Sequence, residues 1–270
     1  WSGRRLLQER YLGDTHDFLK YAFLRHLERV TNFRIGLNWY LTRPEEVDPK
    51  QTNDGEKRFH LTGRRSRKWW EWDQELFDKI KDFEDRSERN LKHFHNLKTL
   101  DPTTTYFEDP VSISEREEWH QRALRTFKDC NFVFLDPDNG FEVPSAKSNR
   151  VAKYSFYSEV ADYYSKGKAV ISIQFTNRKV TAIELANDVR EKVMSEFGLA
   201  TPLPVIRGRV SPNILFVPLA PRDKYQQLKD AIYKMAYRKY GKDYVRAETF
   251  AKSRREGLWR GTVEPPWEWR

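Results

Sequence analysis

The segment FVFLDPDNGFEV, residues 132–143, places three carboxylates directly after an apolar run. The continuous apolar residues 132–135 predict a buried strand, and Asp136, Asp138 and Glu142 follow it. Carboxylates crowded at one strand end repel one another unless protons, cations or hydrogen-bond donors lie nearby. The cluster therefore predicts either a proton-accepting site or a hard oxygen site for Mg²⁺ or Mn²⁺.

The same residues also allow a purely structural interpretation. Pro137 fixes one backbone angle, and Asn139 followed by Gly140 favours a chain reversal. Aspartate and asparagine side chains commonly cap the backbone amides of such turns. The sequence leaves a well-built turn and a reactive site as alternatives.

A second group of reactive side chains occupies YLGDTHDFLKY, residues 11–21. Asp14 is placed to cap a helix that begins near residue 15. Asp17, Lys20 and Tyr21 then fall three and four positions apart, on one side of that helix. The alternative is a capped amphipathic helix that carries a surface ion pair.

A polar loop, residues 43–58, follows the strand candidate 33–42. Asn53-Asp54-Gly55 is a turn signal, and Arg58 follows closely. If this loop leaves the same edge of the sheet as residue 136, Asp54 or Arg58 would face the same cleft as Asp136.

The charge balance favours a polyanionic partner. The 270 residues carry a formal net charge of +9, and aromatic residues make up 14% of the chain. Phosphates attract such charges and bases stack on aromatic rings, so we predict contact with DNA or RNA rather than only a solvated basic surface. The residues expected to make this contact are Arg64, Arg65, Arg67, Lys68, Trp69, Arg178, Arg254 and Arg255.

Composition also limits which partners and which cellular compartment are expected. No apolar run reaches the roughly 18 residues of a membrane helix, so no membrane partner is expected. The single cysteine, Cys130, excludes an internal disulfide and predicts a cytoplasmic protein. The sequence leaves the oligomeric state open.

Hydrophobic periodicity predicts an α/β fold. Expected strands are 33–42, 132–135, 169–175, 203–208 and 213–220, and expected helices are 15–31, 69–100, 114–127, 155–165, 180–197 and 222–240. Ser114 and Glu117 form a capping-box pattern at the start of the third helix. Alternating strands and helices predict a three-layer, mainly parallel, Rossmann-like sheet. The expected organisation is one domain, 1–249, with a helical insertion at about 64–125 and an irregular tail, 250–270.

Ligands of such sheets bind beyond the carboxyl ends of the strands. If residues 132–135 form a strand, Asp136 lies at such an end. This position makes DPDNG a candidate ligand-binding site and not only a turn.

The ordered motifs YLGDTHDFLKY and LDPDNG resemble the methyltransferase-fold family of bacterial 23S ribosomal RNA adenine-N6 methyltransferases. They also resemble uncharacterised bacterial and phage proteins that share YLGDTxDFxKY and LDPDNG. The resemblance covers residues 11–60 and 130–175 and implies a methyltransferase-like fold with S-adenosylmethionine as cofactor. It implies catalytic roles for Asp136, Pro137, Asp138 and Asn139, and cofactor-binding roles for Asp14, Asp17, Lys20, Asn38 and Asp54.

The sequence departs from that family in two places. GLNWYLT, residues 36–42, lacks the glycine-rich turn that follows the first strand in the family. Asp138-Asn139 stands where the family has Pro-Tyr, which leaves Phe141 or Tyr154 to stack on a flipped base.

Three functions therefore remain from the sequence. The first is a nucleic-acid enzyme that transfers a methyl group from S-adenosylmethionine to a base amine. The second is a divalent-metal-dependent nuclease or phosphodiesterase that uses Asp136, Asp138 and Glu142, with Lys153 or Arg178 steadying the phosphate. The third is a non-catalytic nucleic-acid-binding module.

Overall fold

A computed structural model describes residues 8–43, 57–64, 66–146, 148–177, 179–199, 203–210 and 212–235. The chain divides into two units, Trp1–Ala231 and Ile232–Arg270. The described residues of the second unit, 232–235, are helical. Both β-sheets belong to the first unit.

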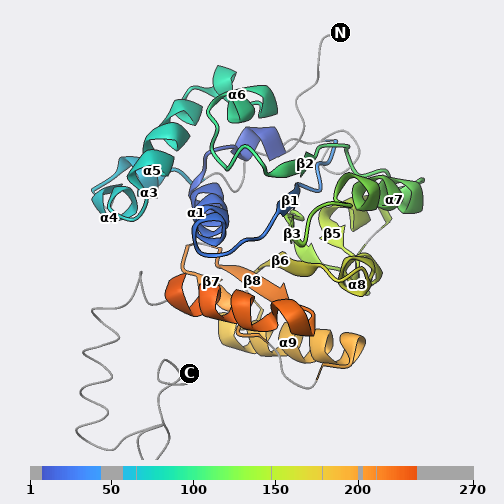
Figure 1. Cartoon of the computed structure of the whole chain (residues 1–270). Helices are drawn as coiled ribbons and strands as arrows, with labels where there is room; N and C mark the ends of the chain where they lie inside the picture. Colours follow the sequence, from blue (N-terminus) through green and yellow to red (C-terminus); the bar gives the residue numbers. More distant parts are fainter. Residues whose placement is uncertain are drawn as a thin grey trace, which may run out of the picture. The chain divides into compact units, whose positions relative to one another are not determined.

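A six-stranded sheet with strand order β2-β1-β3-β6-β8-β7 forms the centre of the first unit (Figure 1). Strands β2, β1, β3 and β6 run parallel, whereas β8 is antiparallel to both of its neighbours. A second, two-stranded sheet pairs β4 with β5. The bounds are β1 Ile35–Asn38, β2 Thr105–Phe107, β3 Phe132–Leu135, β4 Gly140–Phe141, β5 Tyr154–Ser155, β6 Ala169–Phe175, β7 Ile206–Gly208 and β8 Ile214–Leu219.

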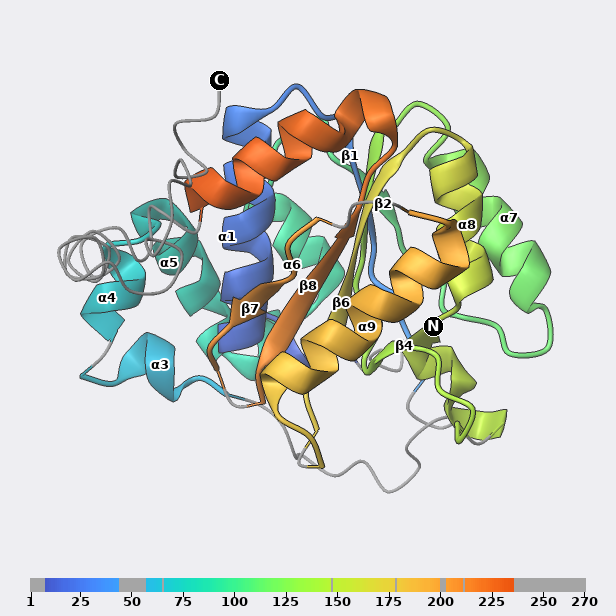
Figure 2. The same cartoon turned by 90° about the horizontal axis from the view of Figure 1, so that it is seen from below.

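Helices cover the sheet on both faces (Figure 2). The α-helices are α1 Thr15–Val30, α3 Phe59–Thr62, α4 Ser66–Trp70, α5 Gln74–Lys81, α6 Leu91–Asn96, α7 Arg116–Thr126, α8 Tyr157–Ser165 and α9 Ala182–Phe197. Residues 222–231 are also helical. Short 3-10 turns are η1 Gln8–Tyr11, η2 Asp82–Glu84, η3 Arg86–Glu88 and η4 Ser148–Lys153.

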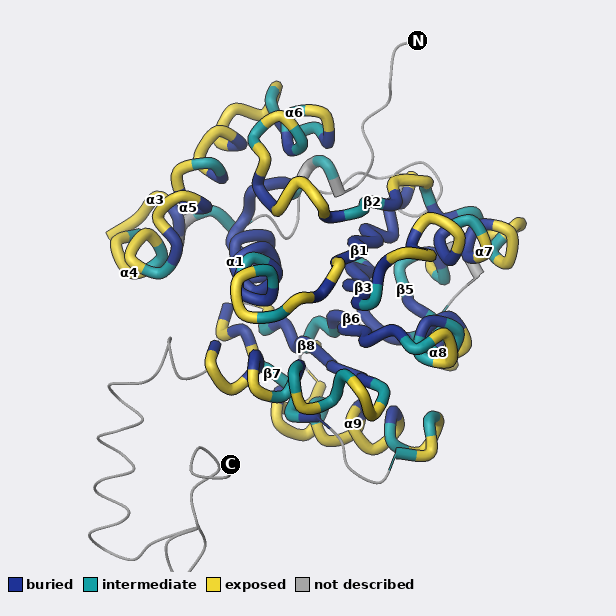
Figure 3. The backbone as a smooth tube through the Cα atoms, in the orientation of Figure 1, coloured by how far each residue is buried: buried dark blue, intermediate teal, exposed yellow. Residues whose placement is uncertain are grey.

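Alternate residues of the central strands bury two separate apolar faces. On one face Phe23 of α1 packs against Phe216, with ring centroids 5.2 Å apart. On the other face, Val133 and Leu135 of β3 join a buried cluster with residues of α7, α8 and α9. Figure 3 shows these strands as buried backbone between more exposed helices. The arrangement has three layers, α/β/α.

The prediction of a mostly parallel α/β sheet is confirmed, and the architecture is compatible with a Rossmann-like fold. The predicted bounds of β3 and β6 match the structure, because both strands are apolar on two covered faces. Among the described residues, no helix is both long and apolar enough to cross a membrane.

The span expected to be a helical insertion, about 64–125, also contributes to the sheet. Its strand β2 pairs in parallel with β1, and α7 then leads back to β3. Residues 69–100, expected to be helical, form several short helices, because Asp73, Asp85 and Asn90 each cap a new helical turn with their side chains.

The capping box expected at Ser114 is also wrong. Helix α7 begins at Arg116, and its N-cap residue, Glu115, makes no side-chain capping bond. Instead, Arg116 ties the helix start to its surroundings by donating to Glu159 Oε2 (2.9 Å) and the Tyr154 carbonyl (2.7 Å). The start of α7 is thus held in place by tertiary contacts of one arginine.

A glycine in β1 permits the close approach of α7 to the sheet. A Cβ atom on Gly36 would lie 2.5 Å from Cδ1 of Phe127, and Phe127 is fully buried. Such a separation is far shorter than a van der Waals contact. The end of α7 can therefore pack on β1 only where β1 lacks a side chain.

We predict that Gly36→Ala lowers the free energy of unfolding by about 1–3 kcal/mol, because the added methyl overpacks the core. Urea denaturation measures the change. The double variant Gly36→Ala/Phe127→Leu should recover part of the loss, since the smaller side chain leaves room for the methyl. Additive losses in the double variant would contradict this contact.

Candidate functional site

The start of α1 orients the acidic side chain of Asp17. The Asp14 carboxylate caps the helix by accepting from the Asp17 N–H (2.9 Å). Gly13 has a φ of 75°, and its N–H donates to Asp17 Oδ2 (3.0 Å). The first turn thereby fixes one oxygen of Asp17 and leaves the other directed at Lys20.

Lys20 joins the first helix to the DPDNG turn. Its ammonium nitrogen lies 2.7 Å from Asp17 Oδ1 and 2.8 Å from Asp136 Oδ2. Lys20, Asp17 and Asp136 are exposed by only 8%, 5% and 6%. This buried group, the Lys20 cluster, unites residues that the sequence placed in two separate motifs.

The Lys20 cluster lies at the carboxyl edge of the parallel strands. Asp136 directly follows β3, and its N–H donates to the carbonyl of Asn38 at the end of β1 (2.9 Å). The chain continues from β1 to β2 on one side of β1, and β3 lies on the other side. Such a topological switch point is where open α/β sheets bind their ligands.

The pKa values of Asp136 and Lys20 indicate different roles for the two side chains. Burial raises the pKa of Asp136 to about 6, although the Lys20 charge opposes the shift. Burial alone would lower the pKa of Lys20, but the charges of Asp136 and Asp17 outweigh it and raise that pKa above its ordinary value. Lys20 therefore stays an ammonium at neutral pH, whereas Asp136 can exchange a proton near it.

An aromatic wall borders the cluster. Burial, followed by the nearby charges of Asp17 and Asp136, raises the pKa of the Tyr21 hydroxyl well above its ordinary value. The Tyr21 ring packs on Phe94, with centroids 5.0 Å apart, and Phe94 contacts Trp39 edge-on at 5.2 Å. These rings keep the cluster in a low-dielectric environment, which strengthens its charge interactions.

The three carboxylates of the DPDNG segment do not converge. Asp136 is held by Lys20, whereas Asp138 Oδ2 lies 3.6 Å from Lys153 Nζ. Glu142 Oε1 accepts from the Tyr157 N–H (2.8 Å) at the start of α8. Among the described residues, no group of three or more His, Cys, Asp or Glu side chains is placed to hold a metal ion. The metal site predicted from Asp136, Asp138 and Glu142 is therefore not assembled.

The remainder of the DPDNG segment, from Pro137 to Gly140, connects β3 to β4. The Asn139 N–H donates to the Lys153 carbonyl (2.9 Å), and its own carbonyl accepts from Gln174 Nε2 (3.0 Å). Gly140 has a φ of 124°. Asn139 thus makes backbone contacts typical of a structural turn. Asp136 is the residue of the predicted catalytic group whose contact with Lys20 is established.

The two aromatic residues proposed to stack on a base differ in burial. Phe141 is buried and stacks on Tyr157, with ring centroids 4.8 Å apart. It therefore serves packing rather than ligand contact. Tyr154 is half-buried in β5.

The other residues predicted to bind the cofactor are Asn38, Asp14 and Asp54, and the structure describes the first two. Asn38 is fully buried, and its side-chain oxygen accepts from the Tyr40 N–H (3.1 Å). Asp14 is engaged in capping α1. Asp54 lies outside the described residues, but Arg58 donates to the Gly13 carbonyl (3.0 Å) and so supports the turn that positions Asp17.

The predicted nucleic-acid contacts are only partly covered by the described residues. Arg64, Arg67 and Lys68 are exposed, on or just before α4. Trp69 instead packs edge-on against Phe18 of α1, with centroids 5.3 Å apart. The other predicted contacts, Arg65, Arg178, Arg254 and Arg255, lie outside the described residues.

One candidate residue escaped the sequence analysis. Glu108 directly follows β2, whose Phe107 is in register with Asn38 of β1, so this carboxylate lies at the same edge of the sheet. Its side chain is 40% exposed and pairs with His95. The short run TYF, residues 105–107, before Glu108 and Asp109 was the available signal for a strand that ends in carboxylates. It lies within the span that was expected to be a helical insertion.

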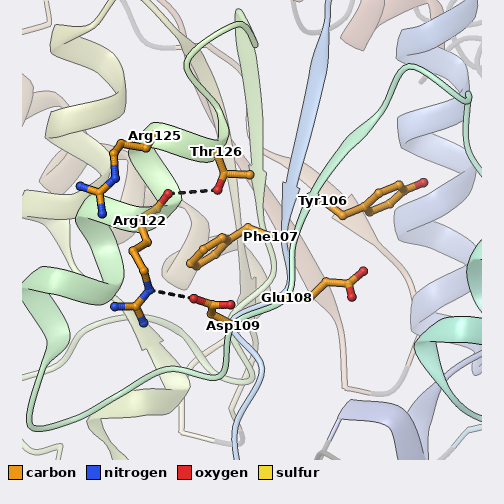
Figure 4. A pocket seen from close by; sticks show the side chains of 7 residues that line it. All are labelled: Tyr106, Phe107, Glu108, Asp109, Arg122, Arg125 and Thr126. Carbon is orange, nitrogen blue, oxygen red and sulfur yellow. Dashed lines mark hydrogen bonds and ion pairs between the residues drawn. The ribbon is translucent and has the colours of Figure 1, made fainter.

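A pocket of about 480 Å³ opens beside Glu108 (Figure 4). Its lining joins the end of β2 to α7, where Arg122 Nε donates to Asp109 Oδ2 (2.8 Å). The lining residues are Tyr106, Phe107, Glu108, Asp109, Arg122, Arg125 and Thr126. The carboxyl edge therefore offers exposed polar groups outside the buried Lys20 cluster.

Comparison of the chain with protein-family models, curated proteins and solved structures finds no match. The class defined by the fold and site is an α/β protein with a buried lysine–carboxylate cluster at a topological switch point.

We predict that Lys20→Met lowers the free energy of unfolding by about 3–5 kcal/mol at pH 7, because it leaves Asp17 and Asp136 buried without a cation. Lowering the pH should shrink this loss. Without Lys20 the two carboxylates have raised pKa values in the folded state, so folding takes up protons and becomes more favourable as the pH falls from 7 towards 5. Urea denaturation at several pH values measures both effects.

Lys79→Met is the matched control for this substitution. Lys79 also pairs with a carboxylate, Glu75, at 2.6 Å, but the Glu75 side chain is 61% exposed. Such surface pairs contribute about 1 kcal/mol or less. Equal losses for the two variants, or a Lys20→Met loss that does not change with pH, would contradict the buried cluster.

Proposed function

We propose that this chain is a nucleic-acid enzyme of methyltransferase-like fold that transfers a methyl group to a base amine. The observation that carries the proposal is the Lys20–Asp136 pair, which lies at the carboxyl end of β3 beside the switch point between β1 and β3. The net charge of +9 supports a polyanionic substrate,. The resemblance of both motifs to the adenine-N6 methyltransferase family supports the reaction class.

Asp136 is the proposed acceptor for the amine hydrogen. Methylation of an amine by a sulfonium donor would form a nitrogen–carbon bond, break the sulfur–carbon bond so that a neutral thioether leaves, and release one proton from the nitrogen. A carboxylate whose pKa lies near 6 is ionised at neutral pH and is still basic enough to take part in that transfer,. Its position after β3 supports contact with a base that enters from the carboxyl edge.

Lys20 is the proposed positioning residue for Asp136. Its raised pKa excludes it as a base at neutral pH. Asp17 and Asp136 already compensate its charge, so binding the carboxylate of a cofactor is not its best role. By holding one oxygen of Asp136, Lys20 orients the other towards a substrate.

Glu108 supports a site for the nucleoside part of S-adenosylmethionine at this edge. When bound, that cofactor supplies an electrophilic methyl group. The exposed Glu108 carboxylate after β2 has the chemistry to accept from ribose hydroxyls, as acidic residues do in other Rossmann-like sheets,. The turn after β1 differs from the family pattern, because buried Trp39 and Tyr40 replace its glycines, with Tyr40 at a φ of 48°.

We predict that the protein methylates single-stranded or structured nucleic acid and that Asp136→Asn lowers the rate by about 100- to 10,000-fold, the range of a lost general base. Transfer of radiolabelled methyl from S-adenosylmethionine to mixed RNA and DNA measures the rate, and calorimetric titration measures cofactor binding. The amide keeps the shape of Asp136 but cannot accept the proton.

Asp129→Asn is the control, since Asp129 is exposed and precedes the opposite end of β3. Thermal unfolding of both variants separates lost chemistry from lost structure. The absence of cofactor binding and methyl transfer, with and without nucleic acid, would overturn the proposal.

A further inference from the structure

We infer that Trp70 and the basic residues beside it form a stacking surface for single-stranded nucleic acid. The surface, called here the α4 surface, consists of Arg64, Arg67, Lys68 and Trp70. The choice of a nucleic acid as the partner rests on the proposed function. The contacts of α4 decide which residues of this segment can touch that partner.

Two neighbouring tryptophans of α4 have opposite roles. Trp69 packs edge-on against Phe18 and lies 6.1 Å from the Trp72 ring, so it attaches α4 to α1. Trp70 is one of the few large apolar side chains exposed on the described surface, at 39%. Consecutive helical residues point about 100° apart, so packing of Trp69 on α1 turns Trp70 outward. The stacking residue is therefore Trp70 rather than Trp69, the residue expected from the sequence.

An exposed cation lies on the same helical face as the exposed indole. Arg67 lies three residues before Trp70, on the same helical face, and its side chain is 84% exposed. Its contact with Glu71 (2.9 Å) is an exposed pair of the kind that contributes little,, so a phosphate can compete for the guanidinium. Lys68 and Arg64 are also exposed. A flat ring with flanking cations matches a chain of phosphates and unstacked bases.

The α4 surface adjoins the helix that supplies the Lys20 cluster. Phe18, the anchor of α4, directly follows Asp17 in the first turn of α1. Figure 2 shows α3 and α4 beside α1. Figures 1 and 2 place α4 on the side of α1 away from β1 and β3, so a strand of nucleic acid held at α4 would have to pass around α1 to reach Asp136. Duplex nucleic acid fits less well, because its bases are stacked within the helix and cannot cover an indole.

The test is fluorescence anisotropy with labelled single-stranded RNA and DNA oligonucleotides. Trp70→Ala should weaken binding about 5- to 150-fold, since each base–aromatic stack contributes about 1–3 kcal/mol. Trp70→Phe should retain most of the affinity. An abasic oligonucleotide should bind wild-type protein and Trp70→Ala equally. Arg67→Gln/Lys68→Gln should reduce the salt slope by about 1.4, the value for two lost phosphate contacts.

Ile183→Ala, which truncates an exposed apolar side chain of α9, is the control and should leave binding unchanged. Unchanged oligonucleotide binding by Trp70→Ala, or equal binding of a duplex of the same sequence, would overturn the inference. Titration of wild-type protein and Trp70→Ala with S-adenosylmethionine keeps the two proposals separate. Loss of oligonucleotide affinity together with no cofactor binding by either protein would support the α4 surface and reject the methyl transfer.

Discussion

The buried ion pair between Lys20 and Asp136 is the interaction on which the proposed site depends. It joins residues that are 116 positions apart in sequence, and Asp17 is a second carboxylate in contact with the same ammonium. Removing Lys20 would leave two carboxylates in a low-dielectric interior without a cation, which costs several kcal/mol. The cluster therefore links the stability of the fold to the protonation of Asp136, the proposed acceptor.

The surrounding fold supplies the position of that pair. The two faces of the sheet are buried by helices, so the carboxyl edge of β1, β2 and β3 is where polar side chains gather. Asn38 ends β1 and accepts from the Asp136 backbone, while Glu108 follows β2 and remains exposed. The switch in chain direction around β1 separates the loops at this edge. Asp136 and Glu108 consequently lie on one edge of the sheet and pair with different partners, Lys20 and His95.

The sequence predicted the elements whose signals are local. The apolar runs of β3 and β6 defined their bounds, and the Asp14 cap located the start of α1. The sequence could not predict that α1 and the DPDNG turn meet through Lys20, because that contact depends on the tertiary arrangement. It also missed β2, whose three residues are too few for a clear period-2 pattern,. The sequence also could not predict that Glu142 accepts from the first N–H of α8, because this contact depends on the pairing of β4 with β5.

Carboxyl NMR titration of the ¹³C-labelled protein tests the central claim most directly. The Asp136 resonance can be assigned by its loss in Asp136→Asn, and exposed Asp129 provides an internal comparison. Burial beside Lys20 predicts a midpoint at about pH 6 for Asp136. A midpoint near the ordinary aspartate value of about 3.9 would contradict the buried, proton-exchanging carboxylate from which the proposed chemistry follows.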